Sequence, residues 1–137
     1  MKYKTENEII KIIESFENGT IARENWRHAD HLLVANYYLS ANDFDAAYNK
    51  MREGIFNLLR SFEIDLSKEM EGYHETLTVF WLKTVDDFRK TKNGCPVVEI
   101  CNELTEKFDK NYPLKFYSRE RLFSDEARAE FIEADLT

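Results

Sequence analysis

The chain has 137 residues, of which 43% are hydrophobic and 14% aromatic, and its formal net charge is −7. This length predicts one domain spanning residues 1–137, large enough to bury a core without disulfides or metal ions. The 19 Lys and Arg residues are scattered without a basic run. This distribution disfavours nucleic acid and an anionic membrane surface as partners.

The glycine, proline and cysteine content indicates a helical fold and a reducing compartment. Only four glycines and two prolines are present, which favours long helices over many short strands. Residues 1–16 have no long apolar run and no small-residue cleavage site, and no later stretch is long and apolar enough to span a bilayer. Cys95 and Cys101 lie far from any histidine in sequence and are typical of reduced thiols. We therefore expect a cytoplasmic protein.

The first two predicted helices have different surroundings. Ile9, Ile13 and Phe16 share one face of a first helix, which Gly19 would end. Segment 26–40 carries apolar residues on most of its sides. This second pattern is typical of a central helix that its neighbours contact on several faces.

Segment 41–62 shows the clearest amphipathic pattern. Asn42 or Asp43 is a suitable N-cap for it. Its apolar residues form one stripe at helical spacing, and its charged residues lie away from that stripe. This pattern predicts a surface helix with a single buried face. The stripe consists of Phe44, Tyr48, Met51, Ile55, Leu58, Leu59 and Phe62.

Segment 73–91 predicts a fourth helix, whose inward stripe begins at His74 and continues through Thr78, Trp81, Val85 and Phe88, with Thr76 facing solvent. After a break at residues 93–96, residues 97–108 predict another amphipathic helix. Ser124, followed by acidic residues, is a typical N-cap of a last one. The fold class expected is therefore all-α, a single compact bundle-like domain of five or six helices.

The three histidines of the chain fall in two of these helices. His28 and His31 are three residues apart and project from one helical face, in front of the small Ala35. His74 begins an inward stripe, at a helix start where the positive end of the dipole favours neutral imidazole. We predict that the three rings converge on one site.

A convergent trio permits metal binding. Three neutral imidazoles with one open position form a site for Zn²⁺ or another divalent first-row metal. Glu24 would share the face of His28 if the helix started by Thr20, but not if Asn25 were its cap. Glu75 and Asp30 are further carboxylates that would orient an imidazole or act as a base.

Two other interpretations of the histidines remain open. They would be structural if they were buried and hydrogen-bonded to partners such as Thr78, Tyr73, Tyr38 or Asp30. They would also suit a pocket that binds a small ligand without a metal. No phosphate-binding loop or nucleophile motif is present to decide between these alternatives.

Three blocks of sequence support a resemblance. They are W-x-H-x-x-H-L at 26–32, Y-H-E-T-L-T at 73–78 and L-x-S-x-x-A-R at 122–128. With them the chain resembles a family of small, mostly bacterial proteins of unknown function. The resemblance has Ala134 where a proline is expected, and it places His28, His31, His74, Glu75, Thr76, Thr78, Ser124 and Arg128 at motif positions.

The function expected from these observations is binding of a small molecule or a divalent metal in a polar pocket of three histidines, with hydrolytic or proton-transfer chemistry. Glu75 or Glu24 would act as base. Arg128 would hold a substrate anion, although an ordinary surface pair with Asp125 is the alternative for it. The rival function is a non-enzymatic interaction module in which the histidines are structural.

Overall fold

The computed structural model describes residues 5–63 and 73–136, and all regular structure in these ranges is helical. Two short helices, α6 (Arg119–Leu122) and α7 (Asp125–Ala129), and the 3-10 turns η1 (Arg23–Asn25) and η2 (Tyr112–Lys115) accompany five longer helices. The all-α prediction is confirmed, with seven α-helices in the described part of the chain where five or six were expected. The five longer ones are α1 (Glu6–Glu17), α2 (His28–Ala41), α3 (Phe44–Ser61), α4 (Glu75–Lys90) and α5 (Val97–Lys107).

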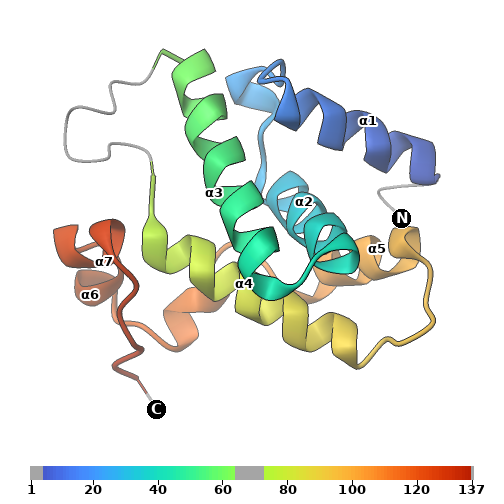
Figure 1. The fold of residues 1–137 in the computed structure, drawn as a ribbon. Coiled ribbons are helices and arrows are strands. Elements are labelled where there is room, and N and C mark those ends of the chain that lie inside the picture. The colour runs from blue at the N-terminus through green and yellow to red at the C-terminus, as the bar shows by residue number, and fades with distance from the viewer. Residues whose placement is uncertain (1–4, 64–72, 137) are drawn as a thin grey trace.

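Helix α2 lies at the centre and contacts α1, α3, α4 and α5 (Figure 1). Leu32, Val34 and Ala35 project in different directions from it, and all three are completely buried. This confirms the prediction of a central helix. It begins at His28 because the Asp30 carboxylate, at 3.1 Å, accepts a hydrogen bond from the backbone N–H of the preceding Arg27.

Helices α1 and α3 pack closely at Gly54. Gly19 ends α1 with a φ of 66°, as predicted, and Asp43 caps α3 by accepting from the Ala46 N–H at 2.8 Å. A Cβ on Gly54 would lie 2.2 Å from the ring of Phe16, so only glycine permits this approach. The buried face of α3 therefore centres on Ala47, Met51, Gly54 and Leu58.

The predicted stripe of α3 is only partly right. Met51, Leu58 and Leu59 are buried, but the other predicted members are half-exposed because the face is rotated toward the side where Phe16 packs on Gly54. These half-exposed residues are Phe44, Tyr48, Ile55 and Phe62.

Residues 117–136, hereafter the C-terminal segment, contain α6 and α7 and lie against α4 (Figure 1). Their own small apolar cluster joins α4 through Leu77 and Phe80. Thr76 is completely buried, where its hydroxyl donates to the Glu130 carbonyl at 2.9 Å and accepts from the Ile132 N–H at 3.2 Å. The expectation that Thr76 faces solvent is wrong, because the C-terminal segment covers that face of α4.

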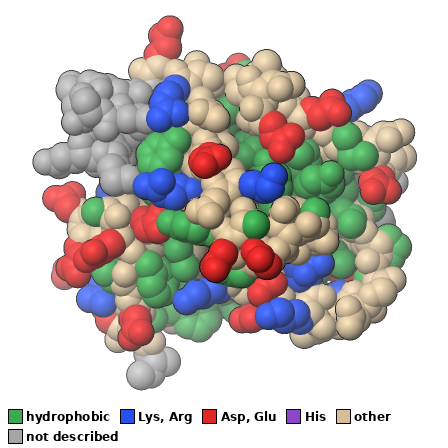
Figure 2. All heavy atoms as spheres, in the orientation of Figure 1, with side chains coloured by type: hydrophobic (Ala, Val, Ile, Leu, Met, Phe, Trp, Pro, Cys, Tyr) green, Lys and Arg blue, Asp and Glu red, His purple; other side chains and the backbone are tan. Residues whose placement is uncertain are grey.

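The surface in Figure 2 mixes basic and acidic side chains rather than gathering either kind. Over residues 5–63 and 73–136, no helix combines the length and the apolar character needed to cross a membrane.

Candidate functional site

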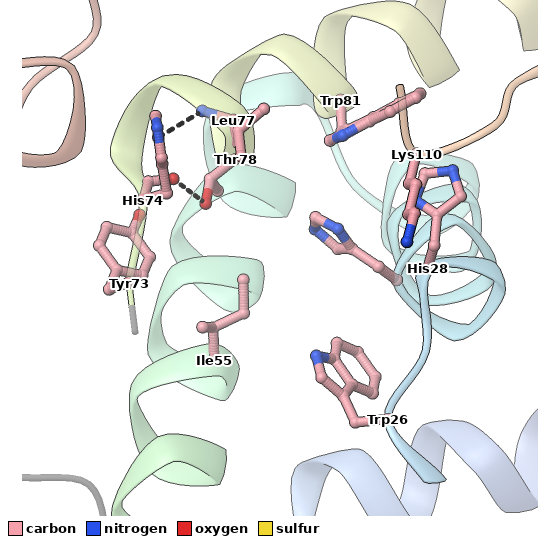
Figure 3. A pocket seen from close by; sticks show the side chains of 10 residues that line it. Trp26, His28, Ile55, Tyr73, His74, Leu77, Thr78, Trp81 and Lys110 are labelled. Carbon is pink, nitrogen blue, oxygen red and sulfur yellow. Dashed lines mark hydrogen bonds between the residues drawn. The ribbon is translucent and has the colours of Figure 1, made fainter. Parts of the chain in front are cut away.

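A cavity of about 270 Å³ lies where the starts of α2 and α4 face each other (Figure 3). His28 is the first residue of α2, His31 follows three residues later, and His74 is the N-cap of α4. All three line this cavity, so the structure brings the three residues to one wall, while the convergence of their ring nitrogens on one ligand stays a prediction. The rest of its wall consists of Trp26, Ile55, Tyr73, Leu77, Thr78, Trp81 and Lys110.

His74 has a hydrogen bond at each ring nitrogen. Its Nδ1 accepts from the Leu77 N–H at 3.1 Å, capping α4, and its Nε2 lies 2.5 Å from the Leu122 carbonyl oxygen, to which it donates. These two bonds require the neutral tautomer with the proton on Nε2. Burial of the ring lowers its pKa, and the positive charge of Arg128 lowers it further. His74 therefore joins the start of α4 to the C-terminal segment.

The ring of His28 has one hydrogen-bond partner in the part of the chain that the structure describes. Its Nε2 donates to the Phe108 carbonyl at 3.0 Å, and its ring lies 4.6 Å from the ring of Trp81. Burial lowers the pKa of His28, although the Phe108 carbonyl and the charge of Asp109 oppose the change. With Nε2 as the donor, the neutral ring presents Nδ1 as an acceptor.

His31 differs from both. Its Nε2 is inaccessible to solvent and has no hydrogen-bond partner in the described structure. Burial lowers the pKa of His31 to about 4, with a further contribution from His28, so the ring is neutral at pH 7. A buried nitrogen without a partner costs free energy, and such exceptions call for an explanation.

The predicted zinc or similar divalent site does not fit these contacts. A three-histidine centre needs one free nitrogen from each ring, and His74 has none unless it releases Leu77 or Leu122. Within the described ranges, no group of three or more His, Cys, Asp or Glu side chains is arranged to hold a metal ion. The geometry therefore suits a metal only after the start of α4 rearranges.

The predicted carboxylates lie away from the cavity. Glu24 is in η1 and α2 begins only at His28, so the condition under which Glu24 would share a helical face with His28 is not met. Glu75 accepts from the hydroxyls of Tyr48 and Tyr73, both at 2.5 Å, and lies 3.7 Å from Arg52 Nε.

These contacts of Glu75 tie α3 to α4. Burial raises the pKa of Tyr48 to about 12, and its hydrogen bond to the carboxylate adds to the change. Glu75 is also absent from the cavity wall. Its carboxylate is occupied by two phenols and a guanidinium, an arrangement that suits a structural role better than that of a base.

Other motif residues occupy the surroundings of His74. Arg128 on α7 lies close enough to lower the pKa of His74, and the ion pairs seen in the described ranges do not include an Arg128–Asp125 pair. Ser124 caps α7, as predicted, by accepting from the Ala127 N–H at 3.2 Å. Thr78 is buried, as predicted, but its hydroxyl donates to the His74 carbonyl at 2.9 Å rather than to an imidazole.

Sequence reasoning missed Lys110, which extends to the cavity from the loop after α5 (Figure 3). It placed Trp81 on an inward stripe, although this residue also lines the cavity, as does Trp26. Their helical spacing carried no sign of this. The residues that share the cavity with Lys110 are separated from it by 29 or more positions, so no local pattern identifies the lysine.

No family model, curated protein or solved structure matches this chain. The resemblance to a small bacterial family therefore remains a prediction. The function has to be argued from the cavity itself.

Proposed function

We propose that this protein binds a small organic molecule in the cavity between α2 and α4, with His31 as the main polar contact. The observation that carries the proposal is a cavity of about 270 Å³ whose wall includes His31, a side chain whose buried Nε2 has no partner in the described structure. A ligand group that hydrogen-bonds to this nitrogen would remove the cost of leaving it unpaired.

The composition of the wall supports this proposal. Small-molecule sites are mainly apolar and aromatic, with a few polar groups that fix orientation. Here the faces of Trp26, Trp81 and Tyr73 accompany the imidazoles of His28 and His31. A concave site with convergent imidazoles favours ligand binding over the rival function, an interaction module with purely structural histidines.

Binding is favoured over hydrolytic or proton-transfer chemistry. A general base works best when its pKa lies near the working pH, and the pKa of His31 is lowered to about 4. His74 is occupied at both nitrogens, and Glu75 lies outside the cavity wall. Hydrogen bonding to a bound molecule is therefore the role that we assign to His31.

The proposal places this binding protein in the cytoplasm. Cys95 and Cys101 are both free, and Cys101 is buried among apolar residues. Burial raises the pKa of Cys101 to about 11, which makes its thiol unreactive. Unpaired thiols of this kind suit a reducing compartment.

The chain contains its own reporter for the test. It has two tryptophans, Trp26 and Trp81, and both line the cavity. A panel of chemically varied fragments should therefore be screened by intrinsic fluorescence and by melting temperature. We expect some members to quench fluorescence and raise the melting temperature of the wild type, and to do neither with His31→Leu. Equal responses from the two proteins, or none at all, would contradict the proposal.

Elemental analysis of the purified protein tests the metal version separately. We expect no stoichiometric zinc, manganese, iron, cobalt, nickel or copper. One equivalent of such a metal that is lost in both His28→Ala and His31→Ala would show that His74 releases one of its partners and that the cavity is a metal centre.

A further inference from the structure

Among the residues that the structure describes, Lys110 is the only Lys, Arg, Asp or Glu that lines the cavity. This is notable in a chain whose formal net charge is −7. The carboxylate of Asp109 does not line the cavity, but its charge raises the pKa of His28.

The cations here are not neutralised by ion pairs. The ion pairs seen in residues 5–63 and 73–136 use Arg52, Lys90 and Lys92, and so leave out both Lys110 and Arg128. Arg128 lies behind His74, where its charge lowers the pKa of that ring, and Lys110 does the same to His28. One cation, Lys110, therefore lines the cavity, and a second, Arg128, acts on His74 in its wall.

Two helix starts add to the same field. His28 is the first residue of the 14-residue α2, and His74 is the N-cap of the 16-residue α4. Each helix has the positive end of its dipole at its N-terminus, and both ends lie at the cavity wall. His31, whose buried Nε2 has no partner in the described structure, lines the same wall, so the positive field and an unsatisfied polar side chain occur together.

The size and the walls of the cavity limit the body of the ligand. An engineered cavity of about 150 Å³ holds benzene, so about 270 Å³ accommodates roughly ten non-hydrogen atoms in proportion. Trp26, Trp81 and Tyr73 present aromatic surface to this volume. A flat apolar body suits such walls, since offset and edge contacts between rings are favourable.

We infer that the ligand is a small aromatic or similarly flat organic acid. Its anionic group lies toward Lys110 and the imidazoles, and its ring lies between Trp26 and Trp81. This inference rests on the proposed function, because it names the chemical class of the molecule that the cavity binds. No bond is made or broken.

Three probes of one shape test the charge of the ligand. Benzoate, benzamide and benzylamine share a ring and differ in carrying a negative, a neutral and a positive group. Each should be titrated into the wild-type protein, with tryptophan fluorescence and melting temperature as readouts. We expect benzoate to bind most tightly and benzylamine least tightly.

Matched lysine variants test where the preference arises. Lys110→Gln should weaken benzoate binding by about fivefold, the size expected for an exposed cation, and leave benzamide binding unchanged. Lys107→Gln is the control. Lys107 lies three residues before Lys110 and carries the same charge, but it does not line this cavity. Equal weakening by both substitutions would assign the preference to general charge rather than to Lys110, and would overturn the inference.

The outcomes separate this inference from the proposed function. Benzamide or benzylamine binding as tightly as benzoate would overturn the organic-acid assignment and leave ligand binding intact. Binding of none of the three would also overturn the assignment, while the wider fragment panel still decides whether the cavity binds small molecules at all.

Discussion

The starts of α2 and α4 resemble each other in sequence but differ in how they use histidine. Both place an imidazole in the wall of one cavity. At α4, the protein itself satisfies both nitrogens of His74, through Leu77 and Leu122. At α2, no group within residues 5–63 and 73–136 reaches Nε2 of His31. A convergent histidine therefore becomes a structural residue or a candidate binding residue according to whether the protein supplies its partners.

The C-terminal segment causes this difference. It lies against α4, where it provides the Leu122 carbonyl to His74 and the backbone groups of Glu130 and Ile132 to Thr76. Helix α2 is instead surrounded by other helices, which bring apolar side chains and few backbone hydrogen-bonding groups to His31. Substitutions at the two helix starts should consequently have opposite effects.

The largest effect is expected for His74→Ala. It removes the cap of α4 and leaves the Leu122 carbonyl without its donor, so the free energy of unfolding should fall by about 2–4 kcal/mol. Urea denaturation at pH 7 measures this loss. His74→Asn keeps a capping oxygen but does not reach Leu122, and should lose about half as much. A loss below about 0.5 kcal/mol for His74→Ala would show that this helix start is not structurally different from α2.

A second effect is expected from pH. The pKa values of all three histidines are lowered in the folded state, that of His31 to about 4. The unfolded chain therefore binds protons first, so stability is complete above about pH 6.5 and falls as the pH drops below it. Each histidine contributes up to about 1.4 kcal/mol per pH unit to this fall.

Unfolding titrations at pH 7, 6 and 5 separate the contribution of His31. Because that ring stays neutral in the folded state down to about pH 4, His31→Leu should retain about 2 kcal/mol more of its stability than the wild type between pH 6.5 and 5. If the stability of the two proteins falls in parallel, the His31 ring takes up protons as readily as a solvated one and the assigned burial is wrong.

The sequence predicted the local features well, because these depend on neighbouring residues. Helical spacing placed His28 and His31 on one face and His74 on an inward stripe, and capping chemistry identified Asp43 and Ser124. The position of all three histidines in one cavity wall followed from these local patterns. The start of α2 was less certain because it depends on one bond, from the Arg27 N–H to Asp30.

Features that depend on distant contacts were not predictable in this way. Thr76 was assigned to solvent because periodicity cannot show that Glu130 and Ile132 lie over it. The rotation of the α3 face depends on the contact between Phe16 and Gly54, and Lys110 enters the cavity from a loop. The hydrogen bond from His74 to the Leu122 carbonyl is also a distant contact, because Leu122 is 48 positions away in sequence.

A smaller loss is expected for Thr76→Val. The substitution conserves shape but leaves the Glu130 carbonyl and the Ile132 N–H without their partner, which should cost about 1–2 kcal/mol. Thr84→Val, a half-exposed site on the same helix, is the control and should stay within about 0.5 kcal/mol. Equal losses at the two positions would indicate that the C-terminal segment does not depend on Thr76.

The smallest effect is expected for His31→Leu at pH 7. Leucine replaces the imidazole by an apolar group of similar size, and no hydrogen bond to Nε2 is lost because the protein makes none there. Removing an unpaired polar atom offsets the loss of ring contacts, such as that with Trp26 at 6.1 Å between centroids. Stability should therefore change by less than about 0.5 kcal/mol or rise, as is common when a binding residue is replaced. A loss above about 1.5 kcal/mol in urea denaturation would mean that His31 has a structural partner, and the contrast between α2 and α4 would then be wrong.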